Sequence, residues 1–365
     1  MVFERRDPLK AIKILALTRY GRLGASSRMR FLQYFPWLQQ AGFELTVAPL
    51  LSDVVLATRY KQGSYGLQPL FRAFADRLRC MLACHQFDVV WIEKEALPWF
   101  PVWIEKWLMR STPYVLDFDD AIFHNYDLHR SAWVRRVYGR RIDSLMEGAR
   151  LVIAGNRYLA GRATSAGARW VEVVPTVVDL ARYPAKQAYS VGTKLRIVWI
   201  GSPSTAQYLL ELGAPLGTLA KRLPFVLRVI GSGVITVPGV DVEVVTWSAD
   251  TEAAEIAECD VGIMPLRDTP WEQGKCAYKL IQYMACGLPT VASPIGANCD
   301  VVIAGETGFF ADNAEAWINN LELLLCDAAL RQCFGQAGRA RVEAQYCLRQ
   351  AAPRLVQVLA AAGGQ

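Results

Sequence analysis

Two lysines upstream of a glycine could form an anion site in the second half of the chain. Lys275 and Lys279 precede Gly287, where a short predicted helix ends, and Tyr278 and Gln282 lie on the same segment. Residues four apart share one helical face, so both ammonium groups could reach one phosphate near the helix N-terminus. We count these four side chains as candidate binding residues. The alternative is two solvated lysines and a helix-surface glutamine.

Carboxylates follow a predicted strand in the first half of the chain. The strand at 114–117 runs into Asp119 and Asp120, and His124 follows a few residues later. Charged groups at the carboxyl end of a parallel strand lie where ligands bind, so we predict these three residues as catalytic. An aspartate there could bind acceptor hydroxyls or stabilise developing positive charge. The alternative is that Asp119 or Asp120 caps a helix.

Three further positions could meet a phosphate, an acceptor or an aromatic base. Gly201 and Ser202 follow a predicted strand and open a helix, where a glycine lets backbone N–H groups approach phosphate closely. Arg28 lies in the glycine-bearing segment after the first strand and could face phosphate or acceptor, or solvent. Trp247 precedes a helical segment, and its flat ring could stack on a base or pack in the core.

Short apolar runs alternate with helical patterns through the chain, which is typical of βα units and a mainly parallel sheet. We therefore predict an α/β fold. The polar stretch at 183–194 separates two groups of predicted strands and is interpreted as a linker. Helical patterns run from about 314 onwards, and no strand is predicted after 292. The predicted strands are 12–17, 44–48, 88–92, 114–117, 151–154, 171–174, 195–200, 225–230, 240–244, 261–264 and 290–292.

Four segments resemble, in order, motifs of the retaining, family-four type of GT-B glycosyltransferase, the glycosyl transferases group 1. The last of them reproduces the end of the donor-binding motif. Two glutamates of that motif correspond to Gly274 and Gln282 and are absent here. A basic pair that follows the glycine turn in many relatives is also absent after Gly201. The four segments are 173–179, 195–202, 259–266 and 285–292.

The resemblance implies a GT-B fold, with two Rossmann-like domains whose parallel sheets face a central cleft. It implies an acceptor-side domain at 1–185, a nucleotide-sugar donor domain at 186–345, and a helix at 346–365 that crosses back to the first domain. Gly201 and Ser202 would lie at the diphosphate, Gln282 at the ribose and Trp247 at the base. Lys275 and Lys279 would then supply the positive charge for the diphosphate.

The activity implied is transfer of a sugar from a nucleotide-sugar to a hydroxyl acceptor, with retention and without a metal or other cofactor. A lipid-linked or polysaccharide glycan is the acceptor that this resemblance favours. Two alternatives stay open. A nucleotide-sugar epimerase or hydrolase could use the same fold, and the two absent glutamates are compatible with an inactive GT-B-like binding protein.

The net charge of +6 divides unequally, with +10 in residues 1–190 and −4 in the remainder. Arginine-rich amphipathic helices are predicted near 70–79 and 130–141, and Trp99, Trp103 and Trp107 recur between them. Such segments suit an anionic membrane surface, although a solvated face over packed aromatic residues is the alternative. We expect a cytoplasmic protein, peripheral on the inner leaflet, because no signal-peptide core or spanning segment is found. No nucleic-acid module accompanies the charge.

The nine cysteines show neither Cys-x-x-Cys pairs nor metal-ligand spacing. We interpret them as reduced, buried thiols.

Overall fold

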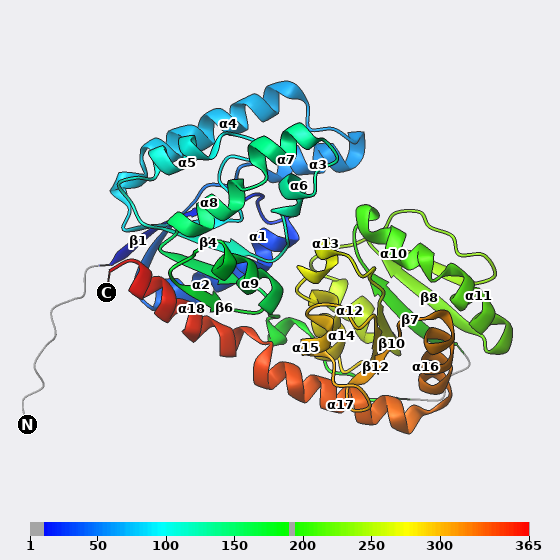
Figure 1. Cartoon of the computed structure of the whole chain (residues 1–365). Helices are drawn as coiled ribbons and strands as arrows, with labels where there is room; N and C mark the ends of the chain where they lie inside the picture. Colours follow the sequence, from blue (N-terminus) through cyan, green and yellow to red (C-terminus); the bar gives the residue numbers. More distant parts are fainter. Residues whose placement is uncertain (1–10, 190–193, 365) are drawn as a thin grey trace, which may run out of the picture. The chain divides into compact units, whose positions relative to one another are not determined.

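Two parallel sheets of six strands each form the framework of the computed structural model, which describes residues 11–189 and 194–364 (Figure 1). The predicted α/β fold of two parallel sheets is confirmed. The first sheet has the order β2-β1-β3-β4-β5-β6 and contains β1 (Ile12–Leu17), β2 (Phe43–Val47), β3 (Val89–Glu93), β4 (Tyr114–Phe118), β5 (Leu151–Ala154) and β6 (Val171–Val173). The second has the order β12-β11-β10-β7-β8-β9 and contains β7 (Leu195–Ile200), β8 (Phe225–Ile230), β9 (Asp241–Val245), β10 (Val261–Met264), β11 (Thr290–Ala292) and β12 (Gly308–Phe310).

Helices connect most consecutive strands, as parallel pairing favours, whereas β8 and β9 are joined by the helix-free segment 231–240. Those in the first part of the chain are α1 (Ala25–Arg30), α2 (Phe35–Gln40), α3 (Asp53–Gln62), α4 (Leu67–Leu82), α5 (Val102–Leu108), α6 (His124–Asp127), α7 (Ala132–Tyr138), α8 (Arg141–Gly148) and α9 (Arg157–Ser165). Those that follow are α10 (Ala206–Glu211), α11 (Gly213–Arg222), α12 (Glu252–Ala257), α13 (Pro270–Gln273), α14 (Tyr278–Ala285), α15 (Asn298–Val301), α16 (Ala314–Cys326), α17 (Ala328–Gln345) and α18 (Leu348–Ala362).

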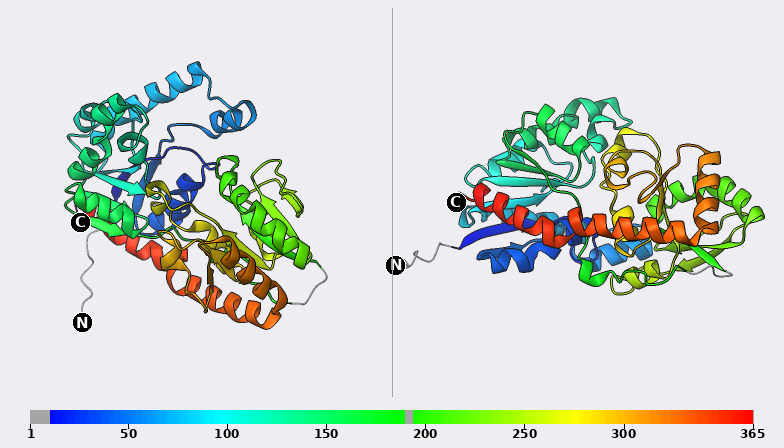
Figure 2. Two further views of the ribbon diagram at one scale, coloured as in Figure 1. Left: turned by 45° about the vertical axis from the view of Figure 1, so that its right-hand side comes forward. Right: turned by 90° about the horizontal axis from the view of Figure 1, so that it is seen from below.

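The chain divides into two compact units, unit 1 (1–174 and 352–365) and unit 2 (175–351). Figure 2 shows α18, in red, beside the sheet of unit 1, where Arg354 Nη2 lies 2.7 Å from Glu172 Oε2 of β6. The first segment of unit 1 ends at residue 174, whereas the first domain was predicted to end at 185. The boundary lies earlier because Val178 and Tyr183 are buried in the core of unit 2.

The predicted linker at 183–194 is in fact bound to unit 2 over its first part. Lys186 N donates to Cys286 O at 2.9 Å, and its Nζ lies 3.0 Å from Asp260 Oδ1. Tyr189 donates its hydroxyl to Gly287 O at 2.6 Å. Residues 190–193 of this predicted linker lie outside the described residues.

Strand β12 was not predicted, because its three residues begin with a glycine and lie in no longer apolar run; the equally short β11 was found because it lies in the motif at 285–292. It pairs with β11 in parallel, with Gly308 opposite Thr290. A Cβ atom at Gly308 would lie 2.2 Å from Thr290 O, so only glycine allows this approach. The end of α14, by contrast, is as predicted: Gly287 has φ +77°, the left-handed conformation that ends many helices.

All nine cysteines are free thiols, but Cys299, Cys326 and Cys333 are exposed, so the interpretation as buried thiols is wrong for these three. Within residues 11–189 and 194–364, no helix combines the length and the apolar character needed to span a bilayer.

Candidate functional site

Helix α14 is fixed against the sheet of unit 2 by one tyrosine. Ile200 N, at the end of β7, donates to the buried Tyr283 hydroxyl at 3.0 Å. The Tyr283 ring lies on β10 at Gly262, where a Cβ atom would be 2.3 Å from Tyr283 Cδ2. The beginning of α14 and the turn after β7 are therefore held at the same end of the sheet.

Lys279 projects from α14 over the face of the buried Trp199, with Nζ 4.4 Å from the ring centre. Burial, assisted by the nearby charge of Lys275, lowers the pKa of Lys279 to about 7. Among the described residues, no carboxylate and no hydrogen-bond acceptor is within reach of this amine. A partly buried cation without a counter-charge is suited to an anionic ligand.

The turn after β7 packs against the Trp199 ring as well. A Cβ atom at Gly201 would lie 2.4 Å from Trp199 Cη2, so the turn needs glycine there. Lys279 and the Gly201–Ser202 turn therefore lie around one ring. The Gly201 N–H itself is not available for phosphate, because it donates to Ile230 O at 2.9 Å. Ser202 is exposed and precedes a short 3-10 helix (Pro203–Thr205).

Lys275 does not share a helical face with Lys279, because α14 begins at Tyr278. It lies in the segment between α13 and α14, with its ammonium 5.9 Å from the centre of the Tyr208 ring. The residue before the helix, Ala277, has φ +52°, which is rare for a residue with a side chain. Backbone of this kind is concentrated at functional sites.

Gln282 is buried and is not the surface residue of the alternative reading. Its Nε2 donates to the Tyr183 hydroxyl at 2.9 Å, and that hydroxyl lies 3.3 Å from both the Tyr278 hydroxyl and Glu252 Oε1. Trp247 Nε1 donates to Glu252 Oε2 at 2.7 Å, so Trp247 belongs to the same network. Burial and the Glu252 carboxylate raise the pKa of Tyr183, which keeps its hydroxyl protonated.

Glu272 is a buried carboxylate of this region that the sequence analysis missed. It accepts hydrogen bonds from the hydroxyls of Tyr208 and Thr269. Glu272 lies two residues before Gly274, the position that corresponds to a glutamate of the family motif. This nearness to the motif position is the signal in the sequence that could have identified Glu272. Glu252 and Tyr183 carried no such signal, because their roles depend on contacts between distant segments.

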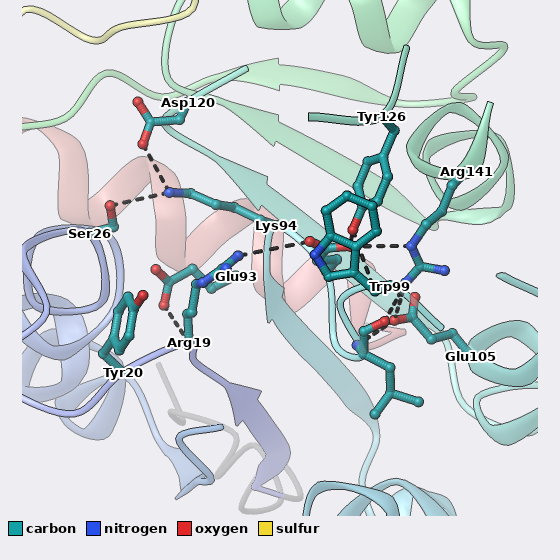
Figure 3. Close-up of polar contacts among 12 residues, drawn as sticks. Arg19, Tyr20, Ser26, Glu93, Lys94, Trp99, Glu105, Asp120, Tyr126 and Arg141 are labelled. Carbon is teal, nitrogen blue, oxygen red and sulfur yellow. Dashed lines mark hydrogen bonds and ion pairs between the residues drawn. The ribbon is translucent and has the colours of Figure 1, made fainter. Parts of the chain in front are cut away.

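Unit 1 has its own charged cluster, centred on Lys94, at the carboxyl ends of β3 and β4. Lys94 Nζ lies 2.8 Å from Asp119 Oδ1 and 3.1 Å from Asp120 Oδ2. Figure 3 shows Ser26 and Asp120 directed at this amine, with Ser26 Oγ at 3.3 Å. Burial opposes the charge, but the two aspartates raise the pKa of Lys94, and Lys94 in turn lowers that of the buried Asp119. Lys94 has φ +65°, a second strained position at a candidate site.

Glu93 extends this cluster toward β1. Its Oε2 accepts from Ser27 Oγ at 2.6 Å and from Arg19 N at 2.7 Å. Burial raises the pKa of Glu93, and Asp119 adds to that effect. Glu93 and Lys94 were missed, although Glu93 ends β3 and Lys94 follows it, and the strand-end argument used for Asp119 and Asp120 would have found them.

A second layer supports the cluster from the side of α5 and α8. The buried Arg141 lies 2.7 Å from Glu105 Oε1 and 3.3 Å from Glu95 Oε2 (Figure 3). Glu95 also accepts from the Tyr126 hydroxyl at 2.8 Å. Burial raises the pKa of Glu105 to about 7, although Arg141 opposes that shift. These contacts fix the segment that follows Lys94.

His124 hydrogen-bonds to groups other than Asp119 and Asp120. Its Nδ1 lies 2.8 Å from Asp127 Oδ1 and its Nε2 lies 2.8 Å from the Tyr158 hydroxyl. Both ring nitrogens are therefore engaged within unit 1, and a catalytic role for His124 stays a prediction. The cap alternative is wrong for the aspartates, because α6 begins at His124 without a side-chain cap.

The Arg28 side chain hydrogen-bonds to the loop that precedes α1. Its Nη1 donates to Arg22 O at 3.0 Å. The backbone N–H groups of Arg22 and Leu23 donate to Asp53 at 3.1 and 2.9 Å, which holds the same loop against α3. A role toward phosphate or acceptor stays a prediction.

Comparison with known proteins finds one family model that matches within unit 2. Residues 194–327 match the family model for glycosyl transferases group 1. A search of curated protein sequences finds no significant match. Among solved structures, the fold is similar to Anabaena HepE in complex with UDP-glucose, at 17% identity and a TM-score of 0.67, covering 96% of this chain and 100% of that one.

Two further structures share the fold over nearly the whole chain. Sucrose-phosphate synthase from Thermosynechococcus elongatus has 14% identity and a TM-score of 0.69, covering 95% of this chain and 98% of its own. A glycosyltransferase from Rickettsia africae has 12% identity and a TM-score of 0.67, covering 97% and 99%. The two-sheet architecture is therefore the GT-B fold of glycosyltransferases.

Proposed function

We propose that this protein transfers a sugar from a nucleotide diphosphate sugar to an acceptor hydroxyl, with retention and without a metal. One observation carries the proposal: Lys279, a cation without a counter-charge, lies beside the Gly201 turn in the part of the chain that matches the glycosyltransferase family. A departing diphosphate needs positive charge and hydrogen-bond donors at that position more than it needs a nucleophile. HepE, with the same fold, is described in complex with UDP-glucose.

In this proposal, unit 2 binds the donor. Lys279 and Lys275 neutralise the diphosphate, and the Gly201–Ser202 turn lies beside it. The Tyr183 network positions Gln282, an uncharged substitute for the carboxylate that binds ribose in the family, and Trp247, which would lie at the base. Unit 1 binds the acceptor through Asp119 and Asp120, which both form ion pairs with Lys94. We propose a lipid-linked or polysaccharide glycan as acceptor.

The test is a thermal-shift screen of the full chain against uridine, guanosine, adenosine and thymidine diphosphates. A ligand that binds the native state raises the unfolding midpoint by mass action. Nucleotide sugars that carry the base with the largest shift are then incubated with glycan acceptors. The products are analysed by mass spectrometry. Rapid release of free or epimerised sugar without acceptor would instead identify a hydrolase or epimerase, and binding without turnover a non-catalytic protein.

Asp120→Asn is expected to lower turnover about 10- to 100-fold, because it removes a charge-assisted hydrogen bond to the acceptor. Nucleotide affinity should stay unchanged, because the proposed donor residues belong to unit 2. Turnover and affinity are measured separately, by product formation and by titration calorimetry. Asp76→Asn, at an exposed position of α4, is the matched control. Full turnover in Asp120→Asn would reject the acceptor role.

We also propose that unit 1 is peripheral on an anionic membrane leaflet. Trp103 and Trp107 of α5 are 66% and 53% exposed and Trp133 of α7 is 65% exposed, so these rings are not the packed aromatic residues of the alternative reading. Tryptophan is favoured at membrane interfaces. Two of the predicted surface arginines do not contribute: Arg77 and Arg141 are buried and donate to backbone carbonyls. Arg136 and Arg140 remain exposed.

Co-sedimentation with vesicles tests this surface. Binding should be stronger to anionic than to neutral vesicles and should fall as salt rises, since charges are screened within about 8 Å at physiological salt. Arg136→Ala/Arg140→Ala should weaken the anionic component, and Trp103→Ala/Trp107→Ala should weaken binding at every salt concentration. Lys221→Ala, in unit 2, is the control. Equal partition onto both vesicle types, or none onto either, would contradict the proposal and indicate an acceptor that is not membrane-borne.

A further inference from the structure

A basic cavity opens at the opposite edge of the unit 1 sheet from the Lys94 cluster. Its volume is about 660 Å³, within the range of roughly 300–1,000 Å³ that is typical of small-molecule sites. Tyr114, the first residue of β4, and Arg150, just before β5, belong to its lining, so it lies at the amino ends of these strands. Its charged lining residues are Lys106, Arg110, Glu147, Arg150 and Arg169.

The four cations of this cavity form no ion pair within the part of the chain that the structure describes. Lys106 Nζ lies 3.4 Å from Ser144 Oγ, and the Arg110 guanidinium lies 4.7 Å from the centre of the exposed Trp107 ring. The side chains of Arg150 and Arg169 have no hydrogen-bond partner among the described residues. Clefts lined by charge of one sign concentrate ligands of the opposite sign.

Capping of helix ends does not explain these cations. Helices α5 and α8 both end at the cavity, where Met109 and Ala149 line it, and basic side chains often bind such terminal carbonyls. None of the four cations donates to a backbone carbonyl among the described residues. Each helix end contributes about half a negative charge, so with Glu147 the lining still retains roughly two positive charges.

We propose that this cavity binds a phosphate-bearing ligand, at a site separate from the proposed donor and acceptor residues. The planar guanidinium groups of Arg150 and Arg169 match the paired oxygens of a phosphate, and Trp170 supplies an aromatic wall for the group that carries it. A phospholipid headgroup and a soluble phosphate ester share this chemistry. The inference does not depend on the proposed glycosyl transfer, because it uses none of those residues.

The test is titration calorimetry of inorganic pyrophosphate into the full chain, carried out in a Lys279→Ala background to remove the proposed donor site. Arg150→Ala/Arg169→Ala in that background should weaken binding about tenfold or more, the scale of a lost charge-assisted contact. Lys221→Ala/Arg349→Ala, which removes the same charge from exposed positions of unit 2, should leave binding unchanged. Circular dichroism verifies folding, and Arg150→Lys/Arg169→Lys should recover part of the affinity.

A second arm identifies the source of the phosphate. Vesicles of phosphatidylcholine with phosphatidic acid are compared with pure phosphatidylcholine, using the same variants. Binding to phosphatidic acid that is lost with Arg150 and Arg169 supports a lipid headgroup, whereas an effect on pyrophosphate alone supports a soluble ester. Pyrophosphate binding that is absent at low salt in the Lys279→Ala background, or equal in the cavity and control variants, would overturn the proposal.

Discussion

Lys94→Met is expected to lower the free energy of unfolding by about 3–5 kcal/mol, the scale of breaking a buried ion pair by removing one partner. The substitution leaves Asp119, Asp120 and Glu93 close together without their shared cation. Methionine keeps the length of the side chain, so the lost charge dominates the effect. Urea denaturation at neutral pH measures the change. Lys106→Met, at an exposed lysine of the same unit, should cost well under 1 kcal/mol.

The pH dependence of this loss distinguishes electrostatics from packing. In the native protein, Lys94 lowers the pKa of Asp119, so this aspartate stabilises the fold above its unfolded pKa of about 4, and the contribution is lost as pH falls. Without Lys94, burial raises that pKa above its unfolded value, so the variant loses stability as pH rises above about 4. The difference between the two proteins should therefore shrink toward about pH 4. If the free energy of unfolding of Lys94→Met falls short of the native value by the same amount at neutral pH and at about pH 4, the loss is one of packing only.

Lys279→Ala is expected to weaken nucleotide diphosphate binding by about 1.5–3 kcal/mol, or roughly 10- to 100-fold. The amine has no counter-charge in the described structure, so the ligand phosphate would be its first partner. Removing a partly buried, unpaired amine should leave the free energy of unfolding unchanged or slightly higher, the opposite of its effect on affinity. Titration calorimetry and urea denaturation measure the two quantities, with Lys221→Ala as control. Unchanged affinity would remove Lys279 from the donor site.

The pKa of Lys279 makes the same assignment testable by pH. Burial lowers this pKa to about 7, so the free protein loses the charge as pH rises above 7. A bound diphosphate favours the protonated amine, so binding above pH 7 takes up a proton and affinity should fall with rising pH. The native protein itself should become more stable between about pH 7 and 10, because the unfolded chain then binds the additional proton. In Lys279→Ala, both dependences should disappear.

Strained backbone occurs at both candidate sites. Lys94 and Ala277 have φ of +65° and +52°, conformations that cost on the order of 1–3 kcal/mol for residues with a side chain. Lys94 N donates to Asp117 O at 2.9 Å, so the strained residue is bonded to β4. Ala277 O accepts from Leu280 N at 3.0 Å and so begins α14. The strained residues are therefore Lys94, whose amine pairs with Asp119 and Asp120, and Ala277, which precedes the helix that carries Lys279.

The sequence alone determined the secondary structure and the fold class to a large extent. Apolar runs such as 12–17, 225–230 and 261–264 coincide with β1, β8 and β10, and Gly287 ends α14 as predicted. These features depend on local chemistry: the alternation of strands and helices, and the left-handed conformation that glycine accepts. The resemblance in 195–202 and 285–292 also indicated the family that the model for 194–327 matches. Strand β12, which begins with Gly308 and lies in no longer apolar run, lacked such a signal.

Only the tertiary structure decided which polar groups meet. The sequence could not show that Gln282 is buried against Tyr183, 99 residues away, or that Lys94 pairs with Asp120 across two strand ends. It could not show that His124 is fully engaged by Asp127 and Tyr158. The physical reason is that burial removes water as a partner, so each charge or amide must find one on whichever element the packing brings near. Residue type and spacing set what a side chain can do, and the packing of distant segments sets what it meets.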